Sequence, residues 1–318
     1  MKTYKIGILG VSSVASKRFI PAILKLKNIQ IKFVASRSIK KAEMIGKSLN
    51  CEYGNYKSLF DNSDKLDIVY ISTPPNKRTR YYKECIKNEL HIFAEKPSFI
   101  NYLEAKKILS YSNLKNVFFF ECWMFKFHPQ HLTIKNLLDQ KLIGEINYFE
   151  SKFFYPRPNS KNIRLKKNLK GGVLFDSIGY PINAFNLFFN TKKMISNYFT
   201  IKDKKTKVEK LVNVQLSNGK VIANLSSGFD NNYESFYKIY GNKGTIQLNR
   251  CFSIDENFKN HVIINKNDKI KKIIIKPFDQ FSLMVKNFLH IIEKNVSIKK
   301  HNSKMLNYIT LFDEIFNK

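Results

Sequence analysis

Runs of continuous apolar residues alternate with helix-periodic segments over the first 120 residues. The apolar runs, which end near glycine, proline or a charged residue, are 5–9, 30–35, 66–71, 90–94 and 117–120. The segments that repeat apolar residues at helical spacing are 15–26, 38–49, 81–88 and 102–111. Buried strands that alternate with helices are typical of βαβ units with a parallel sheet. The pattern therefore predicts a doubly wound sheet of the dinucleotide-binding kind.

The pattern changes near residue 121, after which strands predominate. The predicted strands are 146–154, 195–201, 208–216, 221–227, 234–240 and 245–249. The predicted helices are 129–140, 173–188, 280–294 and 303–316. Turn residues at 217–219 and 241–244 mark hairpins. We therefore predict an α/β chain with a Rossmann domain over 1–121 and an α+β domain over 122–318, whose open sheet is mostly antiparallel.

The first strand and the helix after it carry part of a dinucleotide fingerprint. Their turn reads Gly10-Val11-Ser12-Ser13-Val14-Ala15. Gly10 permits the tight turn and Ala15 permits close packing of the helix on the strand. Ser12 replaces the second glycine of the fingerprint, so the match is partial. We predict that Gly10, Ser12, Ser13 and Val14 contact a dinucleotide.

The end of the second strand bears on which cofactor binds. It reads Ser36-Arg37-Ser38 and lacks the Asp or Glu that holds the ribose 2′-hydroxyl in NAD sites. A guanidinium with two hydroxyls suits a 2′-phosphate, although an ordinary loop arginine would read the same way. The segment therefore predicts NADP(H) rather than NAD(H) as the cofactor.

Two further segments carry groups suited to carbonyl chemistry. Glu95-Lys96-Pro97 ends a buried strand, and ligands bind at the carboxyl ends of such strands. Asp176 and Tyr180 are four residues apart and should share a helix face. An ammonium beside a phenol lowers the phenol pKa and also polarises a carbonyl. We expect Lys96, Tyr180 and Asp176 to be catalytic, with Asp176 orienting Lys96 or a substrate hydroxyl; a solvated loop and a surface pair are the plain alternatives.

Five segments in order resemble the Gfo/Idh/MocA oxidoreductase family over nearly the whole chain. They are residues 10–15, 72–75, 95–97, 121–130 and 171–180. The resemblance implies that Lys96 lies beside the nicotinamide and the substrate. The residues that it adds to the cofactor site are Thr73, Pro74, Glu95 and Lys96. Those that it assigns to the substrate are Trp123, Lys126, His128, Arg164, Asp176 and Tyr180.

Tyr180 narrows this resemblance, because many family members have a histidine there. With a tyrosine at this position, the chain resembles the branch that holds dihydrodiol and aldose dehydrogenases, glucose–fructose oxidoreductase and the NDP-hexose 3-ketoreductases. Two residues depart from the pattern: Arg78, where many members have a histidine, and Lys126, where the branch often has an arginine. Both departures leave the substrate open.

Three functions remain open. The first is NADPH-dependent reduction of a nucleotide-linked keto-deoxysugar, with Tyr180 as proton donor assisted by Lys96. The second is NADP-dependent dehydrogenation of a free sugar or a trans-dihydrodiol by the same residues. The third is a non-catalytic dinucleotide-sensing regulator, which Lys96, Asp176 and Tyr180 argue against, because a sensor needs no proton donor.

The composition limits the classes of partner that we expect. The formal net charge is +30, but most of it is lysine scattered along the chain, whereas nucleic-acid readout favours arginine with interleaved aromatics. We therefore expect a positive field that attracts anionic small molecules, and no nucleic acid. No apolar run reaches 18 residues and no signal-like segment opens the chain, so a cytoplasmic protein without a membrane span is expected.

The remaining expectations concern metals and assembly. The four cysteines lie far apart without CxxC spacing, which predicts reduced thiols. His128 and His131 have no carboxylate or cysteine close in sequence, so no metal is expected. An antiparallel sheet with helices on one face leaves its other face open, and we expect a homodimer or homotetramer to form there, as family members commonly do.

Overall fold

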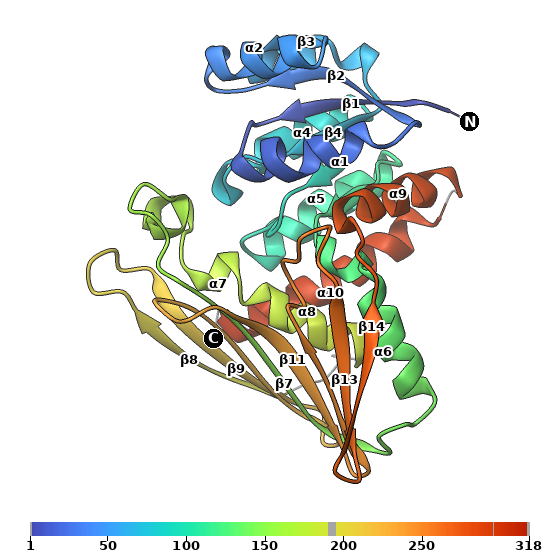
Figure 1. Ribbon diagram of the computed structural model, residues 1–318. Coiled ribbons are helices and arrows are strands. Elements are labelled where there is room, and N and C mark those ends of the chain that lie inside the picture. Colours follow the sequence, from blue (N-terminus) through green and yellow to red (C-terminus); the bar gives the residue numbers. More distant parts are fainter. Residues whose placement is uncertain (1, 190–194, 295, 317–318) are drawn as a thin grey trace. The chain divides into compact units, whose positions relative to one another are not determined.

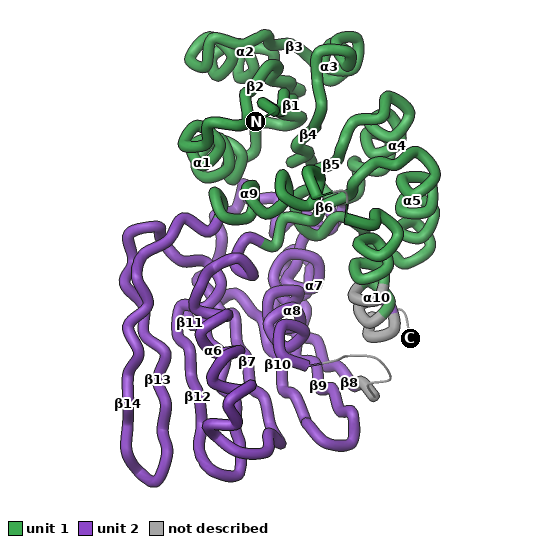
Figure 2. The backbone as a smooth tube through the Cα atoms, turned by 90° about the vertical axis from the view of Figure 1, so that its right-hand side faces the viewer, with its two compact units in different colours: residues 1–123, 281–310 green, residues 124–280, 311–318 purple. Residues whose placement is uncertain are grey.

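The computed structural model describes residues 2–189, 195–294 and 296–316 (Figure 1). The chain forms two compact units (Figure 2). Unit 1 contains the chain up to Trp123 together with Phe281–Thr310, and unit 2 contains Met124–Gln280 and the chain from Leu311. The predicted second domain ran unbroken over 122–318, whereas in the structure residues 281–310 return to unit 1. None of the helices described is long and apolar enough to cross a membrane.

Unit 1 is built on a six-stranded sheet in the order β3-β2-β1-β4-β5-β6, with every neighbouring pair parallel. Its strands are β1 (Tyr4–Leu9), β2 (Ile29–Ala35), β3 (Glu52–Gly54), β4 (Ile68–Ile71), β5 (His91–Ala94) and β6 (Phe119–Glu121). The predicted doubly wound sheet is confirmed. Strand β3 was not predicted, because its three residues are exposed or half-buried and form no apolar run.

The helical segments of unit 1 connect these strands and close the chain. They are η1 (Ala15–Phe19), α1 (Ile20–Leu24), α2 (Ile39–Ser48), α3 (Tyr56–Asp61), η2 (Ser63–Lys65), η3 (Pro75–Lys77), α4 (Thr79–Lys87), α5 (Tyr102–Leu114), α9 (Gln280–Glu293) and α10 (Ile298–Phe316). Phe288 of α9 packs on Phe93 on one sheet face, with ring centroids 4.8 Å apart. Tyr82 of α4 packs on Phe119 on the other face, in a cluster that Ile309 of α10 joins. Burial on both faces explains why these strands are apolar throughout.

Unit 2 is built on an eight-stranded sheet in the order β14-β13-β12-β11-β7-β10-β9-β8. Its strands are β7 (Ile146–Tyr155), β8 (Ile195–Lys202), β9 (Glu209–Ser217), β10 (Ile222–Phe229), β11 (Glu234–Gly241), β12 (Gly244–Asn249), β13 (Asn260–Lys266) and β14 (Lys269–Ile275). Only the β7–β10 pair is parallel among these strands, which confirms the mostly antiparallel prediction. The hairpin β13–β14 at one edge (Figure 2) was not predicted, because lysines interrupt the alternation of β14.

Helices cover one face of this sheet. They are η4 (Met124–Phe127), α6 (Pro129–Asp139), η5 (Ile163–Leu165), η6 (Lys167–Leu169), α7 (Val173–Asp176) and α8 (Gly179–Phe188). Phe185 of α8 packs on Phe149 of β7 with centroids 5.3 Å apart. His131 of α6 is hydrogen-bonded through Nδ1 to the hydroxyl of Tyr237 of β11 at 2.9 Å. The alternate side chains of the strands form the face that these helices leave open.

The single helix predicted over 173–188 is wrong, because the chain breaks between α7 and α8. Ser177 has φ −129° and lies outside both helices. Pro181 has no N–H and stands in the first turn of α8, where proline is tolerated. The carbonyl of Ser177 instead accepts the N–H of Tyr180 at 3.0 Å. Asp176 and Tyr180 are therefore on different helices, and the predicted shared helix face does not exist.

Candidate active site

The carboxyl ends of the central strands of unit 1 lie in register at one sheet edge. Leu9 of β1 pairs with Ala35 of β2 and with Ile71 of β4, and Ile71 pairs with Ala94 of β5. The segments that follow these strands are 10–14, 36–38, 72–75 and 95–98. These segments contain every residue predicted to hold the cofactor, so the fold brings all of them to one edge.

Gly10 lies where the turns after β1 and β4 approach each other. Its φ is +101°, and a Cβ added there would lie 3.1 Å from Ser72 Oγ and 3.2 Å from Thr73 N. Ser72 Oγ donates a 2.6 Å hydrogen bond to the Gly10 carbonyl. Any larger residue would be strained and would separate the two turns. The glycine that the fingerprint predicts is thus required by this contact.

Ser12 explains how the partial fingerprint is accommodated. Its Oγ accepts the N–H of Ala15 at 3.1 Å, and its carbonyl accepts the N–H of Ser16. The hydroxyl therefore caps the helical turn that begins η1, as serine does at helix starts. Ser13 is exposed and Val14 is half-buried.

The turn after β2 has the features predicted for a 2′-phosphate. Ser36 is buried, and its Oγ accepts the N–H of Ser38 at 3.2 Å. Arg37 is exposed, and Ser38 is the N-cap residue of α2. A helix start beside an exposed guanidinium favours a negatively charged ligand.

Thr73 carries a buried hydroxyl suited to a ligand. The residue is 4% exposed, and its Oγ1 has no hydrogen-bond partner within the described residues. Buried polar atoms in native proteins are nearly always paired. Together with the close approach at Gly10 and the absence of a carboxylate at 36–38, this hydroxyl fits a phosphorylated dinucleotide at this edge.

Glu95 and Lys96 form the turn directly after β5, as predicted. The Glu95 carboxylate accepts a 2.8 Å hydrogen bond from the Tyr70 hydroxyl. Burial raises the pKa of the Glu95 carboxyl, while the Tyr70 bond and the Arg78 charge oppose that rise. Lys96 is half-buried and precedes a cis peptide bond to Pro97. The Glu95 side chain is thus held within unit 1.

Arg78 is a residue at this edge that we did not predict for the site. Its side chain is 4% exposed. Its Nε donates to the Thr73 carbonyl at 2.6 Å, and its Nη1 donates to the carbonyls of Glu95 and Pro97. The signal in the sequence was only an arginine where many members of the family have a histidine.

Trp123, predicted for the substrate, is the last residue of the first segment of unit 1. It is 3% exposed, and its indole Nε1 donates to Glu121 Oε2 at 2.7 Å. The other carboxylate oxygen of Glu121 accepts the N–H of Ser98 at 2.7 Å. Glu121 therefore connects Trp123 to the end of the turn that carries Lys96.

In unit 2, Lys126 is half-buried in η4 and His128 is the N-cap residue of α6. His128 Nδ1 accepts the N–H of Gln130 at 3.3 Å, which assigns the proton of the neutral ring to Nε2. Nε2 has no partner in the part of the chain that the structure describes. Burial lowers the pKa of His128 to about 4. At neutral pH the ring can donate a hydrogen bond but is not an imidazolium acid.

Asp176 is held by neighbouring side chains. Its Oδ2 accepts hydrogen bonds from Arg164 Nε at 2.5 Å and from the Tyr155 hydroxyl at 3.2 Å. The Asp176 carboxylate, by its charge, raises the pKa of Arg164 above the usual arginine value. Ser177 Oγ lies 3.4 Å from the Tyr155 hydroxyl and accepts a 2.7 Å bond from Ser227 Oγ. The carboxylate is therefore fixed and charge-balanced by Arg164, which we had predicted to bind the substrate.

The Gly171-Gly172 pair explains how Arg164 reaches Asp176. A Cβ on Gly171 would lie 2.6 Å from the Arg164 carbonyl oxygen. The N–H of Gly172 donates to that same oxygen at 2.8 Å. Without side chains on these glycines, the loop of Arg164 packs directly on the start of α7.

Tyr180 lies in the first turn of α8 and is 6% exposed. Its ring packs among Phe125, Phe153 and Phe252, with centroids 5.1–5.5 Å away. Its hydroxyl donates to Met124 Sδ at 3.7 Å. A thioether is a weak acceptor, so this contact competes only weakly with a substrate oxygen.

Tyr155 is the residue of unit 2 that we missed. It ends β7, two residues after Phe153, so both side chains lie on the helix-covered face of the sheet. The aromatic run over 153–155 was visible in the sequence. Period-two alternation along that run would have placed Tyr155 beside the helix that carries Asp176.

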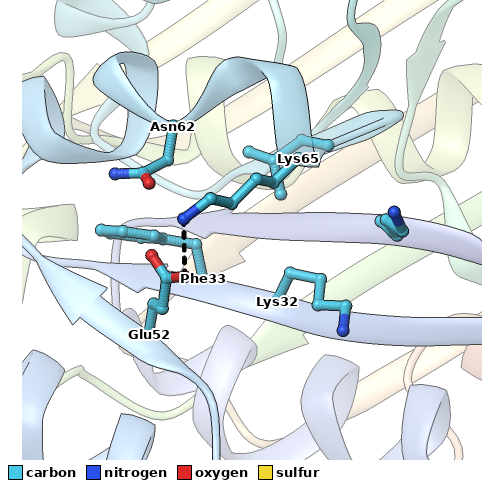
Figure 3. Close-up of a pocket in the computed structure, with 7 residues that line it drawn as sticks. Lys32, Phe33, Glu52, Asn62 and Lys65 are labelled. Atoms are coloured by element: carbon cyan, nitrogen blue, oxygen red, sulfur yellow. Dashed lines mark hydrogen bonds and ion pairs between the residues drawn. The ribbon is translucent and has the colours of Figure 1, made fainter.

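A separate pocket of unit 1 lies away from these groups. Its volume is about 180 Å³, and it lies by the amino-terminal halves of β1 and β3. Lys65 pairs with Glu52 across it at 2.9 Å, beside the ring of Phe33 (Figure 3). It contains none of the predicted site residues. In the described residues, no group of three or more His, Cys, Asp or Glu is placed to hold a metal ion.

Two family models match most of the chain. A model described as an oxidoreductase family with an NAD-binding Rossmann fold matches residues 4–121. A model of the GFO/IDH/MocA C-terminal domain matches residues 131–247. The two matches lie in unit 1 and unit 2 respectively.

Relatives resemble the chain over most of its length. A dTDP-3,4-didehydro-2,6-dideoxy-α-D-glucose 3-reductase of Saccharopolyspora spinosa is 27% identical and aligns over 93% of this chain and 90% of its own. A D-xylose 1-dehydrogenase (NADP(+)) of Haloferax volcanii is 24% identical over 98% and 95%. The crystal structure of a 3-ketoreductase from Actinomadura kijaniata in complex with NADP and TDP-benzene superposes with TM-score 0.94, at 24% identity over 99% and 97% of the two chains.

Proposed function

The chain belongs to the GFO/IDH/MocA family of oxidoreductases, and from this premise we propose that it reduces a ketone of a nucleotide-linked deoxysugar with NADPH. The observation that carries the proposal is the buried Tyr180 hydroxyl, which is bonded to a weak thioether acceptor within an aromatic surround. The relatives named as dTDP-sugar 3-reductases, which align over 90% or more of this chain, support the substrate class.

The cofactor part of the proposal rests on the edge of unit 1. Gly10 and Thr73 are suited to its pyrophosphate side, and Arg37 with Ser36 and Ser38 to a 2′-phosphate. When bound, NADPH supplies the hydride. The NADP present in the 3-ketoreductase structure supports this choice.

The chain's own groups manage the charge and the proton. Lys96 donates a hydrogen bond to the substrate carbonyl oxygen and stabilises the negative charge that develops there. Tyr180 gives its hydroxyl proton to that oxygen, and the Lys96 ammonium stabilises the phenolate until solvent reprotonates it. Asp176, fixed by Arg164 and Tyr155, accepts a hydrogen bond from a neighbouring substrate hydroxyl. We assign Trp123, Lys126 and the His128 Nε2–H to substrate contacts.

A second candidate is dehydrogenation of a free sugar or a trans-dihydrodiol with NADP by the same groups. Relatives carry both activities in their names: the Haloferax D-xylose dehydrogenase, and a trans-1,2-dihydrobenzene-1,2-diol dehydrogenase of Xenopus laevis that is 27% identical over 73% of this chain. Oxidation would use Tyr180 as its phenolate, to accept the hydroxyl proton.

One assay separates the candidates. NADPH oxidation is followed with dTDP-linked 3-keto-deoxysugars and with free keto sugars, and NADP reduction with xylose, glucose and a trans-dihydrodiol. We expect kcat/KM to be highest for a dTDP-linked ketone. Faster turnover of a free sugar or diol would replace the first candidate by the second. No turnover of any substrate, with NADPH bound in a fluorescence titration, would favour the sensing regulator.

Cofactor preference is tested in the same assay. We expect wild type to prefer NADPH, and Ser36→Asp combined with Arg37→Ala to shift the kcat/KM ratio toward NADH by about 10²-fold, because a carboxylate repels the 2′-phosphate. A wild type that uses NADH better would contradict the assignment.

We also propose a cytoplasmic homodimer or homotetramer that forms on the open face of the unit 2 sheet. Phe199, Ile201 and Ile222 lie on that face and are 64%, 52% and 54% exposed. Apolar side chains that gather on one exposed face are typical of interaction surfaces. Light scattering should give at least twice the chain mass at micromolar concentration, and a monomer there would end this proposal.

A further inference from the structure

Arg78 lies at the start of α4, outside the residues assigned above to cofactor or substrate. We infer that it is a positioning residue, which fixes Lys96 by clamping together the turns that follow β4 and β5. The inference rests on the proposed function, because it concerns how the catalytic ammonium is held.

Three backbone carbonyls accept hydrogen bonds from the Arg78 side chain, which also bonds the Tyr82 side chain. The Arg78 guanidinium donates to Thr73 in the turn after β4, and to Glu95 and Pro97 in the turn after β5. Lys96 lies between the last two. The backbone on both sides of the lysine is therefore tied to one rigid, planar group.

Further bonds fix the far end of the same turn. The Ser98 carbonyl accepts the Tyr82 hydroxyl at 3.0 Å, and the Ser98 N–H donates to Glu121 at 2.7 Å. Tyr82 belongs to α4, the helix that Arg78 precedes. The turn is thus anchored to the start of α4 and to β6, and the Lys96 side chain extends from a fixed base.

The chemistry of the clamp calls for arginine. A guanidinium presents five N–H donors in a fixed fork, whereas a lysine ammonium is one compact group on a flexible stem. Three carbonyls that point to a single buried site need donors in several directions. Lysine would satisfy some of them and leave the others unpaired, which is unfavourable in a buried site.

The expected consequence is kinetic. A displacement of a catalytic group by about 1 Å can lower the rate about 10²-fold. Loosening the turn should therefore lower kcat through Lys96. NADPH affinity should change much less, because Gly10 and the 36–38 turn are held by other bonds.

The experiment compares Arg78→Met, which removes all donors, with Arg78→Lys, which keeps the charge. Arg80→Met is the matched control, since Arg80 is exposed two residues along the same helix. We expect kcat to fall about 10²-fold in Arg78→Met and about tenfold in Arg78→Lys, with KM for NADPH within about threefold. Arg80→Met should stay within about twofold of wild type. Wild-type kcat in folded Arg78→Met would overturn the inference, and Arg78→Lys decides if Arg78→Met does not fold.

A double variant separates positioning from a general structural role. If Arg78 acts through Lys96, Arg78→Met should lower kcat no further once Lys96→Met is present. If the two decreases in kcat multiply in the double variant, Arg78 acts on something other than Lys96, and the inference is overturned.

Amide hydrogen exchange gives a readout that needs no substrate. Exchange in the peptide over 95–98 should be about tenfold faster in Arg78→Met than in wild type or Arg80→Met. Unchanged exchange would overturn the clamp. If wild type turns over no substrate while exchange rises as expected, the proposed function fails and the clamp stands.

Discussion

The candidate residues of unit 1 and those of unit 2 are held by different kinds of bond. At the edge of unit 1, side chains mostly bind the main chain: Ser72 to Gly10, Arg78 to three carbonyls and Tyr82 to Ser98. In unit 2, side chains mostly bind one another: Arg164 and Tyr155 to Asp176, and Ser227 to Ser177. Unit 1 thus fixes the path of its turns, whereas unit 2 fixes the direction of one carboxylate.

This difference indicates which substitutions each unit should tolerate. A clamped main chain keeps its shape when an exposed side chain is replaced, so the unit 1 edge should depend on few residues. A side-chain network loses its geometry with any member, because the remaining polar groups must find new partners. The following experiments test that contrast.

The largest effect is expected for Lys96→Met. Turnover should fall by at least about 10³-fold, because the group that stabilises the developing charge is lost. NADPH affinity should stay within about tenfold, since the ammonium acts at the reacting carbonyl and not on the pyrophosphate. Steady-state rates and a fluorescence titration measure both quantities. A variant with near wild-type kcat would remove Lys96 from the mechanism.

The next effect is expected for Tyr180→Phe. Loss of a proton donor should lower kcat by about 10²–10⁴-fold, with little change in melting temperature, since the hydroxyl has a weak acceptor. In wild type, ketone reduction should slow toward alkaline pH, because the reaction needs a protonated donor. That limb should vanish or move in the variant.

The control for this prediction is Tyr148→Phe, which removes a hydroxyl from the open face of the sheet and should leave both rate and pH profile unchanged. If Tyr180→Phe keeps its rate and its basic limb, Tyr180 is not the acid. His128, the next group in line, would then act as a neutral hydrogen-bond donor, because burial holds its pKa at about 4.

A smaller effect is expected for Arg164→Met. Asp176 would lose its charge partner and part of its orientation, so kcat should fall about tenfold and KM for the sugar should rise. Arg157→Met is the matched control, because Arg157 pairs with Asp203 and Asp230 in the same unit. It should lower the melting temperature but leave kcat within about twofold. Equal kinetic effects in both variants would contradict the role of the network.

The smallest effect concerns acid stability. Burial lowers the pKa of His91 in unit 1 to about 4 and that of His131 in unit 2 to about 3, whereas an unfolded histidine titrates near ~6.5. Between these values the unfolded chain binds more protons, so the free energy of unfolding should fall as pH drops from 6.5 toward 4. Melting temperatures between pH 4.5 and 7.5 measure this slope.

Two single variants test whether the buried ring of His131 contributes to this slope of stability against pH. His131→Gln should make it shallower, and His290→Gln, at an exposed position on α9, should leave it unchanged. An unchanged slope in His131→Gln would show that the buried ring is not responsible.

Sequence reasoning succeeded where strand ends fix position. The apolar runs gave β1, β2, β4 and β5, and their parallel register brings Gly10, Thr73 and Lys96 to one edge. It failed where position depends on contacts that are distant in the chain. Three partners of Arg78 are backbone carbonyls, which every residue has, so no side-chain pattern marks them. Pro181 fits a helix start as well as a helix bend, so the break at Ser177 was not visible.

The return of residues 281–310 to unit 1 has a consequence for biosynthesis. Phe288 of α9 covers Phe93 and Phe120, and Asn302 of α10 donates to Ser112 at 2.8 Å. At about 5–20 residues per second, roughly 10–40 s separate the emergence of Phe93 and Phe288 from the ribosome. During that interval Phe93 and Phe120 lack the cover that Phe288 gives them, so the nascent sheet exposes more of its aromatic side chains. A chain truncated before residue 281 should therefore be prone to aggregate. Chaperones should be needed most while the middle of the chain is being translated.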